Sequence, residues 1–454
     1  MTLTAELATF ITSTVYQSIP EPAVAAARRA VLDWIGSAIR GGETEPATIA
    51  QVVAARTMDG DDATVLATRQ QLSVLGAAFA NGVASHALEL DDLHQPAAFH
   101  PGAPIIAAAL AVAERDRLHG RSFLRAVTLG YEVGIRVAEA VGPSHYRYWH
   151  PTATCGVFGA AAATGILLDL TREQMVQALG IAGTQAAGLW AFLDEGAMLK
   201  PLHAGKAAHD GVLAAELALT GGTGARAILE GPRGLFAAMS ADADPSRITD
   251  GLGKRFAVTE VSFKRHACCG HTHAAIDAAL ALRMEIAGRS ITRVEIDTYP
   301  VALEMTNRPA PSTPDAARFS IQYAVASALV RGHAQLDDFL PERLTDPAVR
   351  ALLERTVLRV DPELSRLYPN HWPARVTVTL ADGERLAATV EEPRGTAANP
   401  LSDADLTEKF HGLADPVVGE AAATAIVGAS ERLIHGAPVR ALIDPLWRRV
   451  AQRR

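Results

Sequence analysis

The chain has 454 residues, of which 49% are hydrophobic and 20% charged, a composition typical of a globular protein with room for two domains. Its formal net charge of −8 argues against a general nucleic-acid-binding protein, which would present a basic face. The N-terminus lacks the basic and apolar regions of a signal peptide, and no apolar run reaches the roughly 18–20 residues that span a bilayer. The three cysteines are too few and too badly spaced for a disulfide framework. We therefore expect a cytoplasmic protein with no nucleic-acid or membrane partner.

The chain up to about residue 257 shows the pattern of helices joined by short loops. Prolines suited to a helix start open the run 20–36, and it ends on glycine. Helical runs rich in Ala and Gly follow at 71–90, 102–114 and 156–168. Such runs are too weak to be stable alone, so they predict buried, tightly packed helices. With only 5% aromatic residues, the composition favours this arrangement over a β-sandwich.

The segment 198–211 places two lysines and two histidines among Ala, Gly and Leu. A helix that starts near Pro201 would aim Lys200, His203 and Lys206 broadly the same way. An unpaired buried ammonium is costly, so such cations predict an anionic partner. A small anionic molecule is the interpretation we favour, and a solvated amphipathic face is the alternative.

A second polar segment covers residues 86–102. Its carboxylates, Glu89, Asp91 and Asp92, precede His94 and His100 in a predicted loop before a helix. A carboxylate beside an imidazole tunes the imidazole for general acid–base work. Helix capping and loop hydrogen bonds are the structural alternative.

The third polar segment, 144–159, contains His150 and resembles a loop that leads into a helix N-terminus, where free amides favour an anion. Thr152 or Thr154 as an N-cap is an equally good explanation of the pattern. Cys155 has no activating partner in the sequence, and we expect it to be a small packed residue.

From about residue 258 the pattern changes to alternating strands and helices. The run 291–299 alternates as a half-buried strand does, and 374–390 predicts a hairpin that turns at Asp382-Gly383. Helices are expected at 274–286 and 318–331, and again at 403–411 and 417–434. We predict a mainly α fold in which a helical domain (1–257 and 400–454) carries a smaller α+β domain (258–399).

The α+β domain begins with a fourth polar segment, 264–277. It holds Cys268, Cys269, His271 and His273, yet adjacent cysteines do not easily share one tetrahedral zinc ion and no further ligand pair completes a set. We expect no metal here; one histidine should lie at the start of the following helix and meet the substrate. Arg308, in a loop after a strand, is either a carboxylate-binding residue or a surface ion-pair partner.

Taken together, these segments resemble the MmgE/PrpD family over nearly the whole chain. The resemblance is carried by His86-Ala-Leu-Glu-Leu-Asp-Asp, His100-Pro, His150-Pro-Thr, the Gly-rich run 178–188 and Lys200-Pro-Leu-His-Ala-Gly. It implies a homodimer with a large helical domain and a smaller α+β lid, without cofactor or metal. It also implies an enzyme that transfers a proton next to a carboxylate of a small polycarboxylate, as a dehydratase, a decarboxylase or an epimerase.

The resemblance places some residues in the pocket and shows departures at others. Asp91, Asp92, His100, Lys200 and His273 match pocket residues of the family's cis-aconitate decarboxylase. By contrast, Glu89 replaces an aspartate, Leu93 a threonine and Met305 a tyrosine. The loop between Asp92 and His100 is also one residue longer. These changes remove hydroxyl donors, so we do not expect itaconate production.

Our leading prediction is a cofactor-independent lyase that removes water from a hydroxylated di- or tricarboxylate. Lys200, with His203 or Arg308, would neutralise the charge that develops on the carboxylate. His100 or His273 would be the base, oriented by Asp91 or Asp92. The predicted substrate-binding residues are Glu89, Asp92, His150, His203, Lys206, His271, Met305 and Arg308. An epimerase with two bases is the second prediction, and a non-catalytic polycarboxylate-binding protein is the third.

Overall fold

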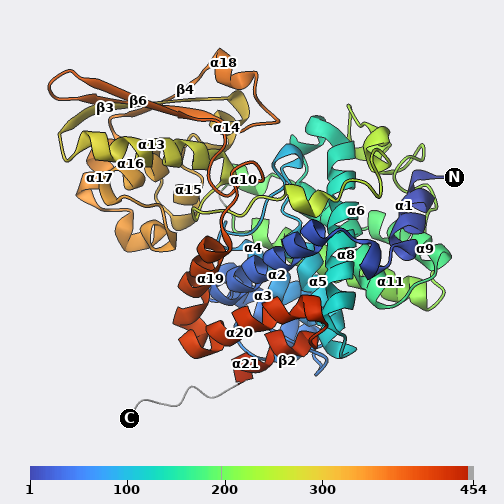
Figure 1. The fold of residues 1–454 in the computed structure, drawn as a ribbon. Coiled ribbons are helices and arrows are strands. Elements are labelled where there is room, and N and C mark those ends of the chain that lie inside the picture. Colours follow the sequence, from blue (N-terminus) through green and yellow to red (C-terminus); the bar gives the residue numbers. More distant parts are fainter. Residues whose placement is uncertain (196, 448–454) are drawn as a thin grey trace, which may run out of the picture. The chain divides into compact units, whose positions relative to one another are not determined.

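The computed structural model describes residues 1–195 and 197–447, and the chain divides into two compact units (Figure 1). The first unit comprises residues 1–87, 91–261 and the chain from 402 onward; the second comprises 88–90 and 262–401. We expected the boundaries after residues 257 and 399, and the structure has them after 261 and 401. The assignment of the short segment 88–90 to the second unit was not anticipated.

The first unit is built of helices, with a single two-stranded ribbon in which β1 (Ala63–Thr64) pairs antiparallel with β2 (Gln71–Leu72) among its described residues. Its α-helices are α1 (Leu3–Ser13), α2 (Glu21–Gly41), α3 (Glu45–Thr57), α4 (Val74–His86), α5 (Gly102–Arg115), α6 (Gly120–Tyr146), α7 (Pro151–Thr154), α8 (Gly156–Leu167), α9 (Arg172–Gly183), α10 (Phe192–Glu195), α11 (Lys200–Leu219), α12 (Leu235–Met239), α19 (Asp403–Val418), α20 (Glu420–Arg432) and α21 (Asp444–Trp447).

Small residues bring the central helices into close contact, as the Ala- and Gly-rich runs predict. Every residue of α8 is buried. Where α4 and α11 meet, a Cβ on Gly205 would lie 2.4 Å from Val83 Cγ2 and 2.5 Å from the Phe79 carbonyl oxygen. A Cβ on Gly82 would lie 2.9 Å from the Gly205 Cα. Backbone therefore packs against backbone, which fixes α11 and its first residues relative to α4.

Several predicted elements need correction. The helix predicted over 71–90 is shorter, because residues 71–72 form β2 and α4 ends at His86. The sequence analysis missed α6, a 27-residue helix interrupted at Gly142, where φ is 72°. It also missed the strand β4 (Thr356–Val360), which lies at the edge of the sheet.

The second unit combines a four-stranded mixed sheet with helices. The strand order is β4–β3–β5–β6; β3 (Ile291–Thr298) runs parallel to β4 and antiparallel to β5 (Ala374–Leu380). Strand β6 (Arg385–Val390) completes the predicted hairpin, with Gly383 at φ 88° in its turn. Helix α13 (His273–Ile286) packs on β5 and β6, and α16 (Ile321–Arg331) packs on α13 (Figure 1). The remaining helices are α14 (Pro300–Thr306), α15 (Pro314–Arg318), α17 (Pro347–Leu353) and α18 (Pro362–Ser365).

The last helices return to the first unit, as the sequence predicts. Helix α19 packs against α2, and the red and blue ribbons lie side by side in Figure 1. Lys409 Nζ of α19 lies 2.5 Å from Asp33 Oδ1 of α2, and both side chains are largely buried. No described helix has both the length and the apolar character needed to cross a membrane.

Candidate active site

The polar residues of the first unit gather around the connection from α4 to α5. His86 is the last residue of α4, and His100 comes two residues before α5 begins at Gly102. Between them, the His94 and Phe99 main chains exchange two hydrogen bonds, of 2.8 and 3.2 Å, which close a short loop around the 3₁₀ turn η2 (Gln95–Ala97). The connection is thus an ordered loop that presents its side chains in fixed positions.

His86 and Asp91 form a buried imidazole–carboxylate pair. His86 Nδ1 lies 2.6 Å from Asp91 Oδ2, and both side chains are at most 1% exposed. The sequence analysis did not choose His86 as a site residue, although it opens the same motif that contains Asp91. Helix α4 ends at His86, and the chain after it turns back so that Asp91, five residues on, meets the His86 ring. The sequence does not show where this helix ends, and so it does not show this pairing.

His100 contacts this pair and has its proton placed by the main chain. Its ring lies edge-on to His86, with centroids 4.8 Å apart. His100 Nδ1 is 2.7 Å from the carbonyl oxygen of Asp92 and 3.4 Å from Asp91 Oδ2. Because a carbonyl only accepts, Nδ1 carries the proton in the neutral ring and the lone pair resides on Nε2. That is the tautomer a general base requires.

Asp92 anchors the loop to two helices. Its Oδ1 accepts a hydrogen bond from the Gly102 N–H at 3.0 Å, and its Oδ2 accepts one from the Tyr131 hydroxyl at 2.7 Å. Burial raises the pKa of Asp92 to about 8, and the Tyr131 hydrogen bond acts in the opposite direction. A Cβ on Gly102 would lie 2.7 Å from the Tyr131 hydroxyl, so this close approach needs glycine. The expected substrate contact of Asp92 stays a prediction.

Two further histidines, His150 and His203, lie next to the His86–Asp91 pair. The His150 ring stacks on His86 with centroids 5.4 Å apart, and its Nδ1 lies 3.2 Å from His203 Nδ1. Burial lowers the pKa of His150 well below its usual value, and the neighbouring imidazoles and Lys200 lower it further. Burial, with His86 and Lys200, lowers the pKa of His203 to about 4. Both rings are therefore neutral at pH 7 in the structure.

Lys200 is the first residue of α11 and is buried. Its charge acts on both His150 and His203. Lys206, two turns further on, has a different environment: its Nζ contacts the Gln185 carbonyl oxygen at 3.0 Å and pairs with Asp210. The three side chains predicted to align on α11 thus separate: Lys200 and His203 act on or contact His150, and Lys206 forms an ion pair with Asp210.

The predicted N-caps of the 144–159 segment are not the caps that form. His150 occupies the N-cap position of α7, without a side-chain cap. The Thr154 hydroxyl instead contacts His145 Nε2 at 2.7 Å. Cys155 is buried, as expected, and burial raises its pKa to about 12.

The second unit holds the other predicted site residues, among them Glu89. Its backbone is left-handed, with φ 56°, and its carboxylate lies 2.9 Å from Lys264 Nζ in a buried ion pair. Backbone of this kind costs about 1–3 kcal/mol in a residue other than glycine. The buried ion pair therefore fixes an otherwise unfavourable conformation.

His273 begins α13, the position expected for a substrate-facing histidine. Burial lowers its pKa well below the usual value, followed by the effects of His266 and Lys264, while a hydrogen bond to the Cys268 main chain acts to raise it. His266 lies edge-on to it at 5.1 Å and its Nε2 is 2.9 Å from Asp277 Oδ1. The second unit thus contains an imidazole–carboxylate pair beside a second imidazole.

The remaining predicted residues of this unit lie in other surroundings. His271 Nδ1 is 2.6 Å from the Tyr299 hydroxyl, and its ring stacks on Trp372 at 3.9 Å. Arg308 donates to the carbonyl oxygen of Met305 at 2.7 Å, so its guanidinium folds back on its own turn. Their predicted contacts with substrate stay predictions.

Two groups among the described residues place three potential metal ligands within 4.8 Å of one another: His86–Asp91–His100, and His94–Glu139–Glu260. In the first, both Nδ1 atoms already donate hydrogen bonds, which an ion would have to replace. In the second, the carboxylates already bind the Arg255 guanidinium. Cys268, Cys269, His271 and His273 belong to neither group.

The chain belongs to the MmgE/PrpD family, whose two domain models match most of it. The MmgE/PrpD N-terminal domain matches residues 5–248, and the C-terminal domain matches residues 266–433. This confirms the predicted family and fold class.

The chain is also similar to named members of this family. It is 30% identical to a cis-aconitate decarboxylase-like protein, oryM, of Aspergillus oryzae, over 92% of this chain and 91% of that protein. It is 30% identical to the human cis-aconitate decarboxylase over 84% of this chain and 82% of the relative. Its similarity to the 2-methylcitrate dehydratase of Salmonella typhimurium, at 28% identity, covers 55% of each chain. These relatives are named as lyases of two kinds.

Proposed function

We propose that this protein is a cofactor-independent lyase that removes a proton next to a carboxylate of a small di- or tricarboxylate. The observation that carries the proposal is the His100 tautomer: the Asp92 carbonyl keeps the proton on Nδ1, so that Nε2 is the basic atom. The buried His86–Asp91 pair beside it supplies negative charge that stabilises the imidazolium formed when His100 takes a proton.

Binding of the substrate is assigned to Lys200, His150 and His203. Proton removal next to a carboxylate places a second negative charge on that group, and a buried ammonium fixed at the start of a helix favours it. The two imidazoles are neutral because of burial and their cationic neighbours. A bound carboxylate offsets these effects, so the pair can bind it as donors.

The leaving group decides the class of lyase. Loss of hydroxide, giving an alkene and water, is the outcome we proposed from the sequence. Decarboxylation is the second candidate because the relatives named cis-aconitate decarboxylase match far more of the chain than the dehydratase does. In that reaction, the C–C bond breaks, carbon dioxide leaves, and the released electron pair is protonated at carbon.

The test is proton NMR in D2O with citrate, 2-methylcitrate, cis-aconitate, malate and iminodisuccinate. New alkene signals, or water added across an alkene, would establish a hydro-lyase, and carbon dioxide with a deuterated product would establish a decarboxylase. Deuterium entering one carbon without an alkene would establish the epimerase alternative. Tight binding of one of these acids with none of these changes would replace the proposal by a binding protein.

Lys200→Ala is the matched control for this assay. We expect it to lower turnover by about 10²–10³-fold, the usual loss when one preorganised charge-stabilising group is removed. Its circular dichroism and melting temperature should stay close to those of the wild type. Near-normal turnover by this variant would remove Lys200 from the proposed mechanism.

The assembly and location also belong to the proposal. We propose that the protein is a homodimer, as the resemblance to the family implies, and that it is located in the cytoplasm. Light scattering coupled to size-exclusion chromatography should give twice the chain mass of 47.9 kDa. A single-chain mass at micromolar concentration would contradict the dimer without affecting the chemistry.

A further inference from the structure

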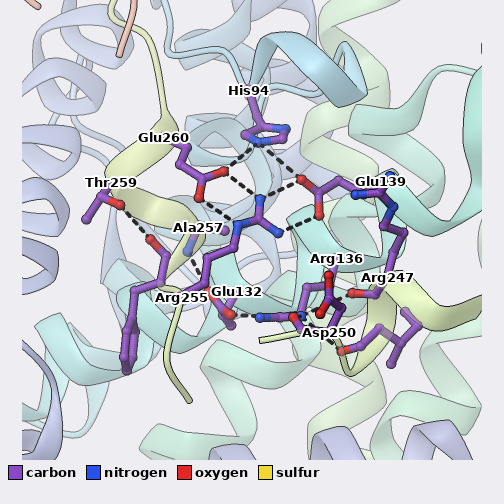
Figure 2. A network of polar contacts seen from close by, with 12 residues as sticks. His94, Glu132, Arg136, Glu139, Arg247, Asp250, Arg255, Ala257, Thr259 and Glu260 are labelled. Atoms are coloured by element: carbon purple, nitrogen blue, oxygen red, sulfur yellow. Dashed lines mark hydrogen bonds and ion pairs between the residues drawn. The ribbon is translucent and has the colours of Figure 1, made fainter. Parts of the chain in front are cut away.

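A charged cluster around the buried His94 lies beside the loop between α4 and α5 and is not used by the proposed chemistry (Figure 2). It consists of His94 in the loop, Glu139 on α6, Arg255, and Glu260 on the 3₁₀ turn η4 (Ala257–Glu260). The Arg255 guanidinium binds both carboxylates in a forked manner. Its four N···O distances are 2.6 and 2.8 Å to Glu139 and 2.5 and 2.6 Å to Glu260.

Without a proton on His94, the cluster has a net charge of −1. Two carboxylates and one guanidinium sum to −1, and the neighbouring buried pair of Glu132 and Arg136 on α6 sums to zero. His94 is fully buried, and its Nε2 lies 3.6 Å from both Glu139 Oε1 and Glu260 Oε2. At this distance the attraction is mainly one of charge, because hydrogen bonds are shorter. A proton on His94 makes the cluster neutral.

Glu260 shows the effect of these neighbours. Burial acts to raise its pKa, but the contacts with Arg255 and His94 outweigh it and lower the pKa to about 2. Glu260 therefore keeps its charge throughout the physiological range, and the negative charge that faces His94 is permanent.

His94 is directly connected to the geometry of the base. It pairs with Phe99 across the loop. His100 directly follows Phe99, and Asp92, whose carbonyl contacts the His100 ring, lies two residues before His94. Phe99 is fully buried. The hydrogen bond that sets the His100 tautomer thus joins residues at most two positions from the His94–Phe99 pair.

We propose that His94 is a positioning residue: by taking up a proton it neutralises the Glu139–Arg255–Glu260 cluster, anchors the loop, and so keeps His100 in its Nδ1–H tautomer. The inference rests on the proposed function in taking His100 as the base. In this proposal His94 does not contact the substrate; it acts by holding the loop that positions His100.

The first test follows the histidine rings of the full-length protein by long-range ¹H–¹⁵N NMR, with no substrate present. We expect a single Nδ1–H tautomer for His100 in the wild type and a mixture of tautomers in His94→Gln. In Glu260→Gln the cluster is neutral without the proton, so the His94 ring should carry one N–H proton instead of two. An unchanged tautomer in the first variant, or two N–H protons on His94 in the second, would overturn the inference.

The second test is a charge-matched double variant. His94→Gln should lower kcat about 10–100-fold with little change in KM, as loss of a group that orients another does. His94→Gln/Glu260→Gln restores neutrality and should recover much of that loss, whereas a residue that only fills space would give no recovery. His333→Gln, which removes a half-exposed histidine paired with Asp338, is the control and should keep kcat within about twofold.

The two proposals fail in different ways. If no carboxylate is turned over, the proposed function falls, while the NMR experiments on the His100 tautomer and the His94 protons still decide the role of His94. If turnover is found and the double variant recovers no more than the single one, the inference falls alone. Should His94→Gln not fold, Glu260→Gln keeps the imidazole, and the number of N–H protons on the His94 ring decides.

Discussion

The two units each contain a histidine–aspartate pair set edge-on to a second histidine, and they differ in what surrounds it. In the first unit the pair is His86–Asp91 and the second ring is His100, at 4.8 Å. In the second unit the pair is His266–Asp277 and the second ring is His273, at 5.1 Å. In both, a main-chain contact holds the second ring.

The surroundings separate the two arrangements chemically. Lys264, the cation near His273, already has a carboxylate partner in Glu89. Around the first pair, by contrast, neutral imidazoles lie within the field of Lys200, and they gain protons most easily when an anion arrives. The comparison teaches that two similar imidazole–carboxylate arrangements can differ in the charges that act on the imidazoles around them.

The largest expected effect tests whether both second rings are used in catalysis. His100→Gln should lower kcat about 10³-fold, and His273→Gln should lower it about 10²-fold, within the range for general acid–base groups. Steady-state kinetics on the substrate found by NMR measures both. Wild-type kcat in His273→Gln would reduce the second arrangement to a structural role.

The next largest expected effect concerns the aspartates of the two pairs, Asp91 and Asp277. Asp91→Asn and Asp277→Asn leave the shape but remove the charge that orients each imidazole, and each should lower kcat about 10–100-fold. If Asp277→Asn has no effect while Asp91→Asn does, the parallel between the units ends at the geometry. Melting temperatures of both variants provide the folding control.

Proton uptake on ligand binding is expected at His203, which lies beside the first arrangement. Burial and nearby cations lower the pKa of His203 to about 4, and a bound carboxylate raises it, so binding takes up protons and weakens as pH rises. Affinity should fall up to about tenfold per pH unit where one proton is taken up. Calorimetry in two buffers of different ionisation enthalpy measures the uptake; none in the wild type would contradict the assignment.

The smallest effect concerns the anchor of the first loop. The pKa of Asp92 is raised to about 8 in the folded chain, above its value of about 3.9 when unfolded. The folded state therefore binds the extra proton between these values, and stability falls as pH rises through that window. Asp92→Asn should remove this dependence, which amounts to about 4 °C in melting temperature between pH 5 and 8. If melting temperature depends on pH equally in the wild type and in Asp92→Asn, the extra proton of the folded state is not on Asp92.

Much of the fold follows from local sequence signals. Pro201 after Lys200 predicted the start of α11, and Asp382-Gly383 predicted the hairpin turn. Small residues predicted close helix packing, as found at Gly205. Helix α6 was missed although its apolar residues follow the helical period; the local signal against one continuous helix is Gly142-Pro143, which interrupts it.

The site was predictable by residue type more than by geometry. The motif supplied Asp91 and His100, but the pairing of Asp91 with His86 depends on a left-handed Glu89 that no local pattern indicates. The His94 cluster joins residues from three separate segments of the chain, and its charge balance exists only in the folded protein. Side-chain partners of this kind are set by tertiary packing.

The Lys409–Asp33 pair joins parts of the chain that are 376 residues apart. During synthesis, α2 emerges early and exposes a carboxylate whose partner comes off the ribosome near the end. The α+β unit, by contrast, is almost continuous in sequence, from 262 to 401, and can fold while the last helices are still being made. The helical unit that carries the histidine loop is therefore the later of the two to be completed, and a chain that stops before α19 leaves its largest unit open at α2.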